Sequence, residues 1–192
     1  TPKMLLCTCD TIETAKEFWG QTILIKNVFE SASQGISSNN RIVVKNDYHK
    51  EISNIINRMN VKQFLLQQYI DGLECEVLVI QFKHQYYAFE PIEIVINGNG
   101  FLDSEISNSY NYSFKKLSDT LSSGIIETIK NSAIKAATAL KIKDYARFDF
   151  RIKGDRPYLI DIAGTPYTIK HSSISYLFEE VLKLEYNDIY KV

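Results

Sequence analysis

The sequence has few of the residues that build disulfide frameworks or metal clusters. Its 192 residues include 3 Cys, at positions 7, 9 and 75, and 3 His, at positions 49, 84 and 171. An odd number of cysteines with no regular spacing is not typical of a disulfide-stabilised secreted domain. Cys7 and Cys9 do not form a Cys-x-x-Cys motif, and the sequence offers no second pair to complete a zinc site. We therefore expect reduced, mostly buried thiols in a cytoplasmic protein.

The chain also lacks a charge excess and a long apolar run. It has 22 basic and 23 acidic side chains, and the net charge of -1 gives no attraction to nucleic acid or to an anionic membrane. No apolar run reaches the ~18 residues of a membrane span, and no signal peptide is recognisable. A hydrophobic content of 45% and an aromatic content of 12% are enough for a core, which excludes global disorder. Because the first residue is Thr1, we expect a piece of a longer protein.

The first 70 residues predict a small α+β unit. Strand-like runs lie at 4–8, 22–27, 41–45 and 63–70, and a polar loop, 28–40, joins the second run to the third. Asp10 and Asp47 are expected to cap helices, the second of which has apolar residues at i, i+3, i+4 and i+7. The turn Asp71-Gly72 places the boundary of this unit at residue 70.

Residues 71–192 predict a second, larger α+β unit. Strand-like runs at 74–82 and 85–96 are separated by Lys83-His84, which we expect to form a hairpin corner. Helices are expected at about 123–140 and 173–184, and a hairpin is expected from the runs 145–152 and 157–162. The polar segment 101–123 has no steady period, and loops of this length are commonly functional. A ligand cleft is expected between the two largely antiparallel units.

Lys26 and the loop behind it form the first candidate site. Lys26 lies near the end of an apolar run, and the small-residue segment 30–36 follows, which includes Glu30, Ser33 and Gly35. A lysine ammonium and the backbone N–H groups of such a loop suit phosphate. The segment lacks the Gly-Lys-Ser/Thr of a Walker A loop, and taken alone it is explained as simply by a solvated hairpin lysine.

Residues 67–74 form the second candidate, an apolar strand followed by a turn and a carboxylate. Backbone groups of Gln67, Gln68, Tyr69 and Ile70 could bind an adenine edge, and Glu74 could accept hydrogen bonds from ribose hydroxyls. An ordinary strand–turn–strand with a surface glutamate is the alternative.

The third candidate lies on the hairpin near residues 147 and 161. Alternation along a strand puts Arg147 and Asp149 on one face, and Asp161 lies on the returning strand, so the two carboxylates could converge. Mg²⁺ binds carboxylate and phosphate oxygens, and an adjacent arginine can stabilise developing negative charge. A pair of surface salt bridges is the alternative. Ser172 is a fourth candidate, either as an N-cap alone or as part of a helix end that binds a substrate carboxylate.

The order of these motifs resembles the ATP-grasp superfamily and, within it, the D-alanine–D-alanine ligases. The motifs are Lys26 with Glu30-x-x-Ser33-x-Gly35-Ile36, Tyr69-Ile70-x-Gly72-x-Glu74, Tyr145-Ala146-Arg147-x-Asp149, Tyr158-Leu159-x-Asp161 and Thr165-Pro166. The resemblance covers nearly the whole chain. It implies an α+β, ATP-grasp fold in which subdomains 1–70, with a phosphate-covering loop at 28–40, and 71–192 enclose a nucleotide cleft. It also implies that the N-terminal domain of a full ligase is absent.

The resemblance further implies an ATP- and Mg²⁺-dependent ligase that joins a carboxylate to an amine through an acyl phosphate. Lys26, Glu30, Ser33 and Gly35 would hold phosphates, and Gln67, Gln68, Tyr69, Ile70 and Glu74 would hold adenosine. Asp149 and Asp161 would be Mg²⁺ ligands, Arg147 would stabilise the transferred phosphoryl group, and Ser172 would meet a substrate carboxylate. The partners would be small molecules such as amino acids, not nucleic acid or membrane, and a homodimer through the missing N-terminal region would be compatible. We expect the fragment alone not to ligate.

Some residues depart from the family pattern. The last metal strand usually reads Glu-x-Asn but here reads Asp161-Ile162-Ala163, and Ala163 has no ligating atom. A lysine usual near Ser107 is absent, and the usual Pro-Gly is Pro166-Tyr167. A divergent ATP-grasp module that binds nucleotide or a partner without turnover is therefore the alternative, and a plain α+β interaction domain is a third reading.

Overall fold

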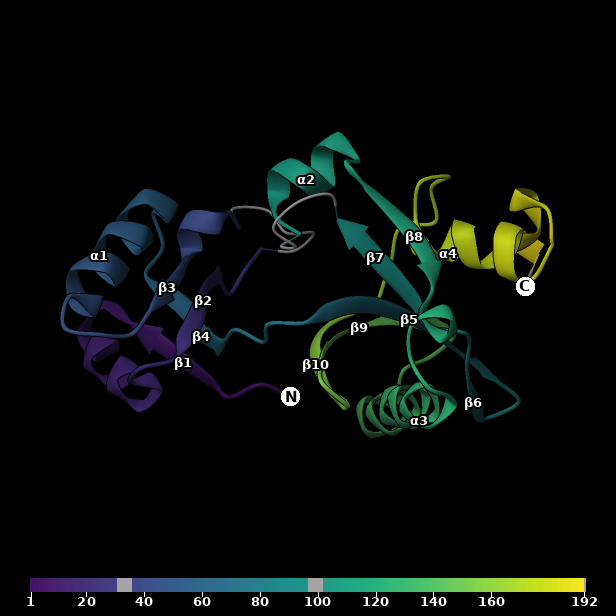
Figure 1. The fold of residues 1–192 in the computed structure, drawn as a ribbon, viewed down its shortest axis with the longest axis horizontal. Helices are drawn as coiled ribbons and strands as arrows, with labels where there is room; N and C mark the ends of the chain where they lie inside the picture. Colours follow the sequence, from purple (N-terminus) through teal and green to yellow (C-terminus); the bar gives the residue numbers. More distant parts are fainter. Residues whose placement is uncertain (31–35, 97–101, 192) are drawn as a thin grey trace. The chain divides into compact units, whose positions relative to one another are not determined.

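The computed structural model describes residues 1–30, 36–96 and 102–191, which fold into two compact units (Figure 1). The first unit contains residues 2–70 and 102–111, and the second contains residues 71–96 and 112–191. The sequence-based division assigned the segment 102–111 to the second subdomain. In the structure, the backbone N–H and the Oγ of Ser104 donate to the carbonyl of Ile36 at 3.0 and 2.9 Å, which attaches the segment to the first unit.

The first unit is built on a 4-stranded antiparallel sheet in the order β1-β4-β2-β3. Its strands are β1 (Met4–Thr8), β2 (Thr22–Asn27), β3 (Arg41–Val43) and β4 (Gln63–Gln68). One face packs on α1 (Tyr48–Met59) and on the 3-10 helix η1 (Cys9–Phe18), and its core includes Ile23, Ile25, Ile52, Phe64 and Leu66. The short helices η2 (Ser38–Asn40) and α2 (Ser104–Ser109) complete the described part of the unit.

Helix starts in the first unit differ in detail from those predicted. Thr8, rather than Asp10, is the N-cap of η1, and the Thr8 N–H donates to Oγ1 of Thr11 at 2.8 Å. Asp47 does precede α1 as predicted, but its side chain makes no capping hydrogen bond. The apolar spacing predicted for this helix is confirmed, because Ile52, Ile55 and Ile56 are buried.

The second unit is built on a 6-stranded sheet in which every pair is antiparallel. The order β10-β9-β5-β7-β8 is made by β10 (Arg156–Ala163), β9 (Tyr145–Lys153), β5 (Leu73–Phe82), β7 (Ile92–Ile96) and β8 (Tyr112–Lys116), and β6 (Gln85–Ala88) pairs with β5. Helix α3 (Ser123–Leu140) packs on one face against Cys75, Val77, Phe148 and Phe150. Helix α4 (Ser173–Tyr176) and the π-helical turn η4 (Leu177–Val181) pack on the other face against Leu78 and Ile92 (Figure 1). The 3-10 helices η3 (Leu117–Asp119) and η5 (Tyr186–Lys191) lie outside the sheet.

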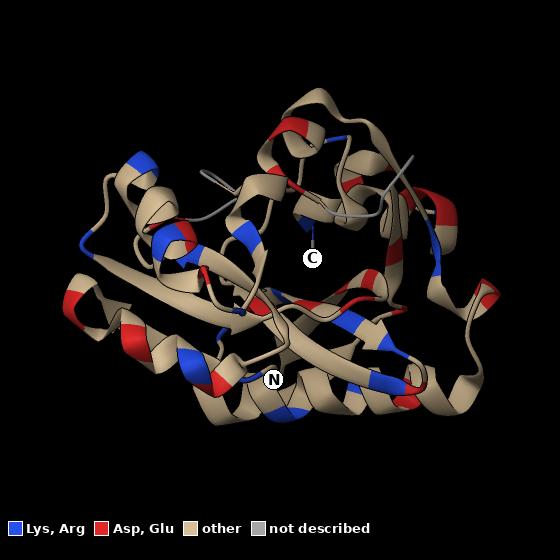
Figure 2. Ribbon diagram, turned by 60° about the vertical axis from the view of Figure 1, so that its left-hand side comes forward, with Lys and Arg blue, Asp and Glu red and all other residues tan. Residues whose placement is uncertain are grey.

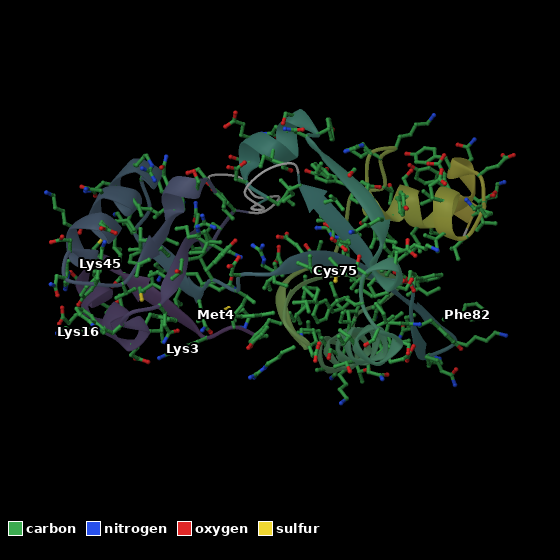
Figure 3. All side chains as sticks on the ribbon, viewed as in Figure 1. Lys3, Met4, Lys16, Lys45, Cys75 and Phe82 are labelled. Atoms are coloured by element: carbon green, nitrogen blue, oxygen red, sulfur yellow. The ribbon has the colours of Figure 1, made fainter. Side chains whose placement is uncertain are left out.

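The prediction of one long strand over 85–96 is wrong, because the structure has two strands there, β6 and β7. The register on β5 changes from Val79 opposite Ala88 to Glu76 opposite Ile92, so one extra residue is accommodated between them. Pro91 lies in this interruption, and it has no N–H group to donate to a neighbouring strand. Its carbonyl accepts a hydrogen bond from the Leu117 N–H at 2.9 Å. The hairpin predicted at Lys83-His84 is confirmed, and it carries Phe82 to the outer end of β5 (Figure 3).

The cysteines are free, and two of them, Cys7 and Cys75, are buried as expected, whereas Cys9 is exposed. Cys75 lies in the interior of the second unit, on the α3 side of its sheet (Figure 3). Burial raises the pKa of the Cys75 thiol, and the carboxylates near it, Asp149 first, add to the effect. The thiol therefore stays protonated and acts as a small core residue. None of the helices in the described ranges has the length and apolar character needed to cross a membrane.

Candidate functional site

Three carboxyl groups lie in one row across the second unit's sheet. Asp161 on β10 is opposite Asp149 on β9, and Asp149 is opposite Glu76 on β5. Residues directly opposite each other in an antiparallel pair point to the same face, with Cβ atoms about 4.5–5.5 Å apart. The row lies on the face opposite α3, since the alternate residues Phe148 and Phe150 pack in the α3 core. Figure 2 shows acidic and basic positions next to each other on these strands.

A β-bulge at Ile160 brings Asp161 onto this face. Leu159 is opposite Phe150, but Asp161 is opposite Asp149, so Ile160 is the extra residue. Both Leu159 and Ile162 pack against the α3 core, although an unbroken strand would turn residues three apart to opposite faces. The sequence-based prediction that the two carboxylates converge depends on this bulge, which alternation alone does not reveal.

Arg147 is clamped between two of these carboxyl groups. Its Nε and Nη2 donate to Oδ1 and Oδ2 of Asp149, both at 2.8 Å, and its Nε lies 3.3 Å from Oε1 of Glu76. The three side chains are 18%, 11% and 9% exposed, so the ion pairs are poorly screened. Burial lowers the pKa of Arg147, but Asp149 and Glu76 outweigh it, and the pKa rises above its ordinary value. Arg147 is a permanent cation here.

For Glu76, burial affects the pKa more than the neighbouring charges do, which is the reverse of the case for Arg147. Burial raises the pKa of Glu76 to about 7, although the Arg147 charge and a hydrogen bond from the Ser173 side chain both lower it. Sequence reasoning missed this residue. The only available signal was its spacing of two from Glu74, which puts both glutamates on one face of β5.

This pKa makes the stability of the protein pH-dependent. The folded-state pKa of Glu76, about 7, is above its ordinary value of 4.5, so the folded state binds the proton more tightly and stability falls as the pH rises from 4.5 through 7. Between pH 5 and pH 8 the free energy of unfolding of the unmodified protein should fall by about 2–3 kcal/mol more than that of Glu76→Gln. Urea unfolding at the two pH values measures the difference, and equal changes in both proteins would contradict the assignment.

Glu74 and Arg151 form a second charged pair on the same face. Glu74 is opposite both Arg151 on β9 and Ile94 on β7. Nη1 of Arg151 lies 3.6 Å from Oε2 of Glu74, and its Nη2 donates to the carbonyl of Gly72 at 3.0 Å. Glu74 was predicted to bind ribose. It lies on the same face as the carboxyl row, two residues before Glu76 on β5.

Ser172 is held at the start of α4. Its Oγ donates to the carbonyl of Ile169 at 2.7 Å and accepts from the Ser175 N–H at 3.1 Å, so it is the N-cap of this short helix. The predicted capping role is confirmed. The neighbouring Ser173 reaches Glu76, so the first turn of α4 lies against the carboxyl row.

The first unit gathers other predicted residues on the face of its sheet opposite α1. Leu24 and Lys26 alternate with the core residues Ile23 and Ile25, and Leu24 is opposite Gln67 on β4. Lys26 is opposite Leu65.

Arg41, which the sequence analysis did not single out, lies opposite Leu24 on this same face, and its guanidinium stacks 4.8 Å from the centre of the Tyr69 ring. The Tyr69 N–H donates to the carbonyl of Thr22 at 2.9 Å, which continues the strand pairing. Gln68, which points to the other face, donates to Gln21 Oε1 at 3.1 Å, and Ile70 is buried.

The predicted phosphate-covering loop 28–40 is only partly described. Glu30 is exposed, and Ser33 and Gly35 lie outside the described residues. Phe29, just before the loop's small-residue segment, has 83% of its surface exposed.

The second unit's donor set fits Mg²⁺ in chemistry. Asp149 and Asp161 supply hard oxygen ligands, and Mg²⁺ is commonly held by one or two carboxylates together with substrate phosphates. This face of the sheet has more acidic than basic side chains, and a divalent cation would neutralise the excess negative charge. The acidic ones are Glu74, Glu76, Asp149 and Asp161, and the basic ones are Arg147 and Arg151. Within the described ranges no group of three or more His, Cys, Asp or Glu side chains is arranged to hold a metal by itself. Ala163, opposite Arg147, adds no ligand.

Residues 3–190 match the family model described as "D-ala D-ala ligase C-terminus". The chain belongs to this family. It is 27% identical over 157 residues to a D-alanine–D-alanine ligase of Shewanella frigidimarina, a match that covers 80% of this chain and 44% of that protein. A Flavobacterium johnsoniae D-alanine–D-alanine ligase is 26% identical over 160 residues, which covers 82% of this chain and 46% of the relative. The chain thus spans about half the length of the curated relatives it matches.

The fold of the family is also found in solved structures. The D-alanine–D-alanine ligase of Bacillus anthracis complexed with ATP superposes with a TM-score of 0.70 at 16% identity, over 100% of this chain and 58% of that one. The fold is therefore the ATP-grasp fold of the D-alanine–D-alanine ligases, as the motif order predicted.

Proposed function

We propose that this chain is the ATP-binding part of an ATP- and Mg²⁺-dependent carboxylate–amine ligase of the D-alanine–D-alanine ligase type. The observation that carries the proposal is the in-register row of Asp161, Asp149 and Glu76 with Arg147 bound across it. Membership of a ligase family supports turnover over the alternative of binding alone. The substrates would be a small carboxylate and an amine, with D-alanine as the first to test.

In this reaction the carboxylate attacks the γ-phosphorus of ATP, which forms an acyl phosphate and ADP. The amine then attacks the acyl carbon, and inorganic phosphate leaves as the amide forms. Little covalent chemistry falls to the protein, because positioning and charge stabilisation provide most of the catalysis in phosphoryl transfer.

Each residue has a role that follows from its chemistry. Asp149 and Asp161 would hold Mg²⁺, which when bound supplies charge neutralisation at the phosphate oxygens. Arg147, a permanent cation beside them, would stabilise the negative charge of the transferred group. Lys26 would bind phosphate as a point charge, together with Glu30, Ser33 and Gly35 of the loop. Gln67, Gln68, Tyr69, Ile70 and Glu74 would bind adenosine, and Ser172 would bind the substrate carboxylate.

Removing the Lys26 charge should weaken nucleotide binding. We expect Lys26→Ala to raise the dissociation constant of ATP in Mg²⁺ by about 10- to 100-fold, because a charge-assisted hydrogen bond contributes about 1.5–3 kcal/mol. Lys45→Ala is the matched control, since Lys45 is an exposed lysine of the same unit. Isothermal titration calorimetry checks the prediction, and equal affinities in the two variants would refute the role of Lys26.

An assay of ATP turnover distinguishes a ligase from a module that only binds nucleotide. The full-length protein that contains this chain is incubated with ATP, Mg²⁺ and a panel of D- and L-amino acids, and release of ADP and phosphate is followed. Amino-acid-dependent release supports the ligase. Binding of ATP without release for any member of the panel would contradict it.

A further inference from the structure

Glu76 is a buried carboxyl group that the proposed chemistry does not use. It is buried, and neither substrate nor cation binding was assigned to it. Bringing a carboxylate out of water costs several kcal/mol unless its partners compensate. Asp149 already takes two hydrogen bonds from the Arg147 guanidinium, so neutralising Arg147 does not require a second acid. The position of Glu76 therefore needs an explanation other than charge balance.

The contacts of Glu76 join two parts of the site. On one side its Oε1 lies 3.3 Å from Nε of Arg147, which comes from β9. On the other side it lies near the side chain of Ser173, in the first turn of α4, which lowers its pKa. Ser172, the N-cap of that turn, precedes Ser173 directly. One carboxyl group on β5 thus contacts the guanidinium and lies beside the turn that carries Ser172.

Glu76 becomes important for holding Arg147 when Asp149 also binds a cation. Arg147 is opposite Leu78 and not opposite Glu76, so its guanidinium extends along the strand to reach both acids. If an Asp149 oxygen is shared with a cation, its hydrogen bonds to Arg147 weaken, and Glu76 is the carboxyl group that continues to hold the guanidinium. An Asp149 oxygen shared with a cation holds Arg147 less strongly, because the charge of the cation repels the guanidinium.

We infer that Glu76 is a positioning residue of the site, which orients Arg147. The inference rests on the proposed function for its consequence in catalysis, but the contacts themselves are a property of the free protein. Glu76 touches no substrate in this account and acts through Arg147.

The chain contains a matched control for this role. Glu93 is also a buried glutamate, on the neighbouring strand β7, and it also contacts one cation and one hydroxyl group. Nζ of Lys115 lies 3.3 Å from its Oε1, and Oγ1 of Thr120 donates to its Oε2 at 2.9 Å. Glu93 is opposite Cys75, so it points to the α3 face, away from Arg147.

The test follows the Nε–H group of Arg147 by ¹⁵N NMR in the protein without nucleotide, with Arg147→Lys used to assign the signal. Glu76→Leu should speed hydrogen exchange at this group at least tenfold, and Glu76→Gln, which keeps the shape and one acceptor oxygen, should speed it at least threefold. Glu93→Gln should leave it unchanged. An unchanged Arg147 signal in Glu76→Gln, or an equal change in Glu93→Gln, would overturn the inference even if Glu76→Leu failed to fold.

A second measurement keeps this inference separate from the proposed function. ATP in Mg²⁺ is titrated into the unmodified protein and into Glu76→Gln. Absence of binding by the unmodified protein would refute the proposed function and leave the Arg147 signal to decide the inference. Binding that is weakened at least threefold in Glu76→Gln and not in Glu93→Gln is the expected result, and equal affinities in all three proteins would contradict the positioning role.

Discussion

Asp149→Asn should weaken binding of ATP in Mg²⁺ on the order of 100-fold. The substitution keeps the shape of the side chain but removes the negative charge from the centre of the carboxyl row. Both carboxylate oxygens of Asp149 now accept hydrogen bonds from Arg147 at 2.8 Å. Asparagine has an NH₂ group in place of one of these oxygens, so one hydrogen bond is lost and two donors face each other. Both consequences disturb the predicted cation site and the arginine beside it. Isothermal titration calorimetry in Mg²⁺ measures the loss.

The control for this variant is Asp155→Asn. Asp155 lies exposed in the turn between β9 and β10, away from the row. Its replacement removes the same charge from the same hairpin and should leave ATP affinity unchanged. Thermal unfolding of both variants shows whether they fold. An Asp149→Asn protein that folds and binds ATP as tightly as the Asp155→Asn protein would disprove the assignment of Asp149.

Gly72→Ala should destabilise the second unit by about 3 kcal/mol, because the added Cβ has no space. A Cβ at Gly72 would overlap the carbonyl oxygen of Ile152 and lie 2.7 Å from its carbonyl carbon. These atoms belong to the backbone of β9 and cannot rotate away. The shift would also disturb the Gly72 carbonyl, which accepts from Arg151 at 3.0 Å. The glycine of the predicted adenosine-binding segment is thus required for close approach of two strands.

Gly124→Ala is the matched comparison for this prediction. Gly124 lies in α3, and a Cβ there would meet no atom within 4 Å. Alanine favours a helix over glycine, so this variant should be neutral or more stable by up to about 1 kcal/mol. Urea unfolding of both variants measures the changes. A Gly72→Ala protein as stable as the Gly124→Ala protein would contradict the packing described for β5 and β9.

Local sequence patterns predicted most of the regular elements. Helix α3 has a helical apolar spacing, and Ile126, Ile129, Ala133 and Ala137 on that face are buried, whereas Leu140 is exposed. The strands of the first unit were predicted from short apolar runs. The segment after residue 101 was not predictable in this way, because neither α2 nor β8 has a fully buried side chain. Elements that lack a buried face leave no periodic signal in the sequence.

The site was predictable where one strand or one motif carries the information. Arg147 and Asp149 share a face by alternation alone. Glu76 enters the site through strand pairing and Asp161 through the bulge at Ile160, and both depend on register between strands distant in the sequence. Arg41 likewise meets Tyr69 through the pairing of three strands. Tertiary register was the missing information in each case.

The central claim is that Asp149 and Asp161 bind nucleotide through a divalent cation, and the dependence of ATP affinity on Mg²⁺ tests it most directly. The protein is titrated with ATP by calorimetry in Mg²⁺ and again with the cation removed by EDTA. We predict a dissociation constant at least tenfold lower in Mg²⁺, and loss of most of this difference in Asp149→Asn. No detectable ATP binding, or the same affinity with and without Mg²⁺, would contradict the account.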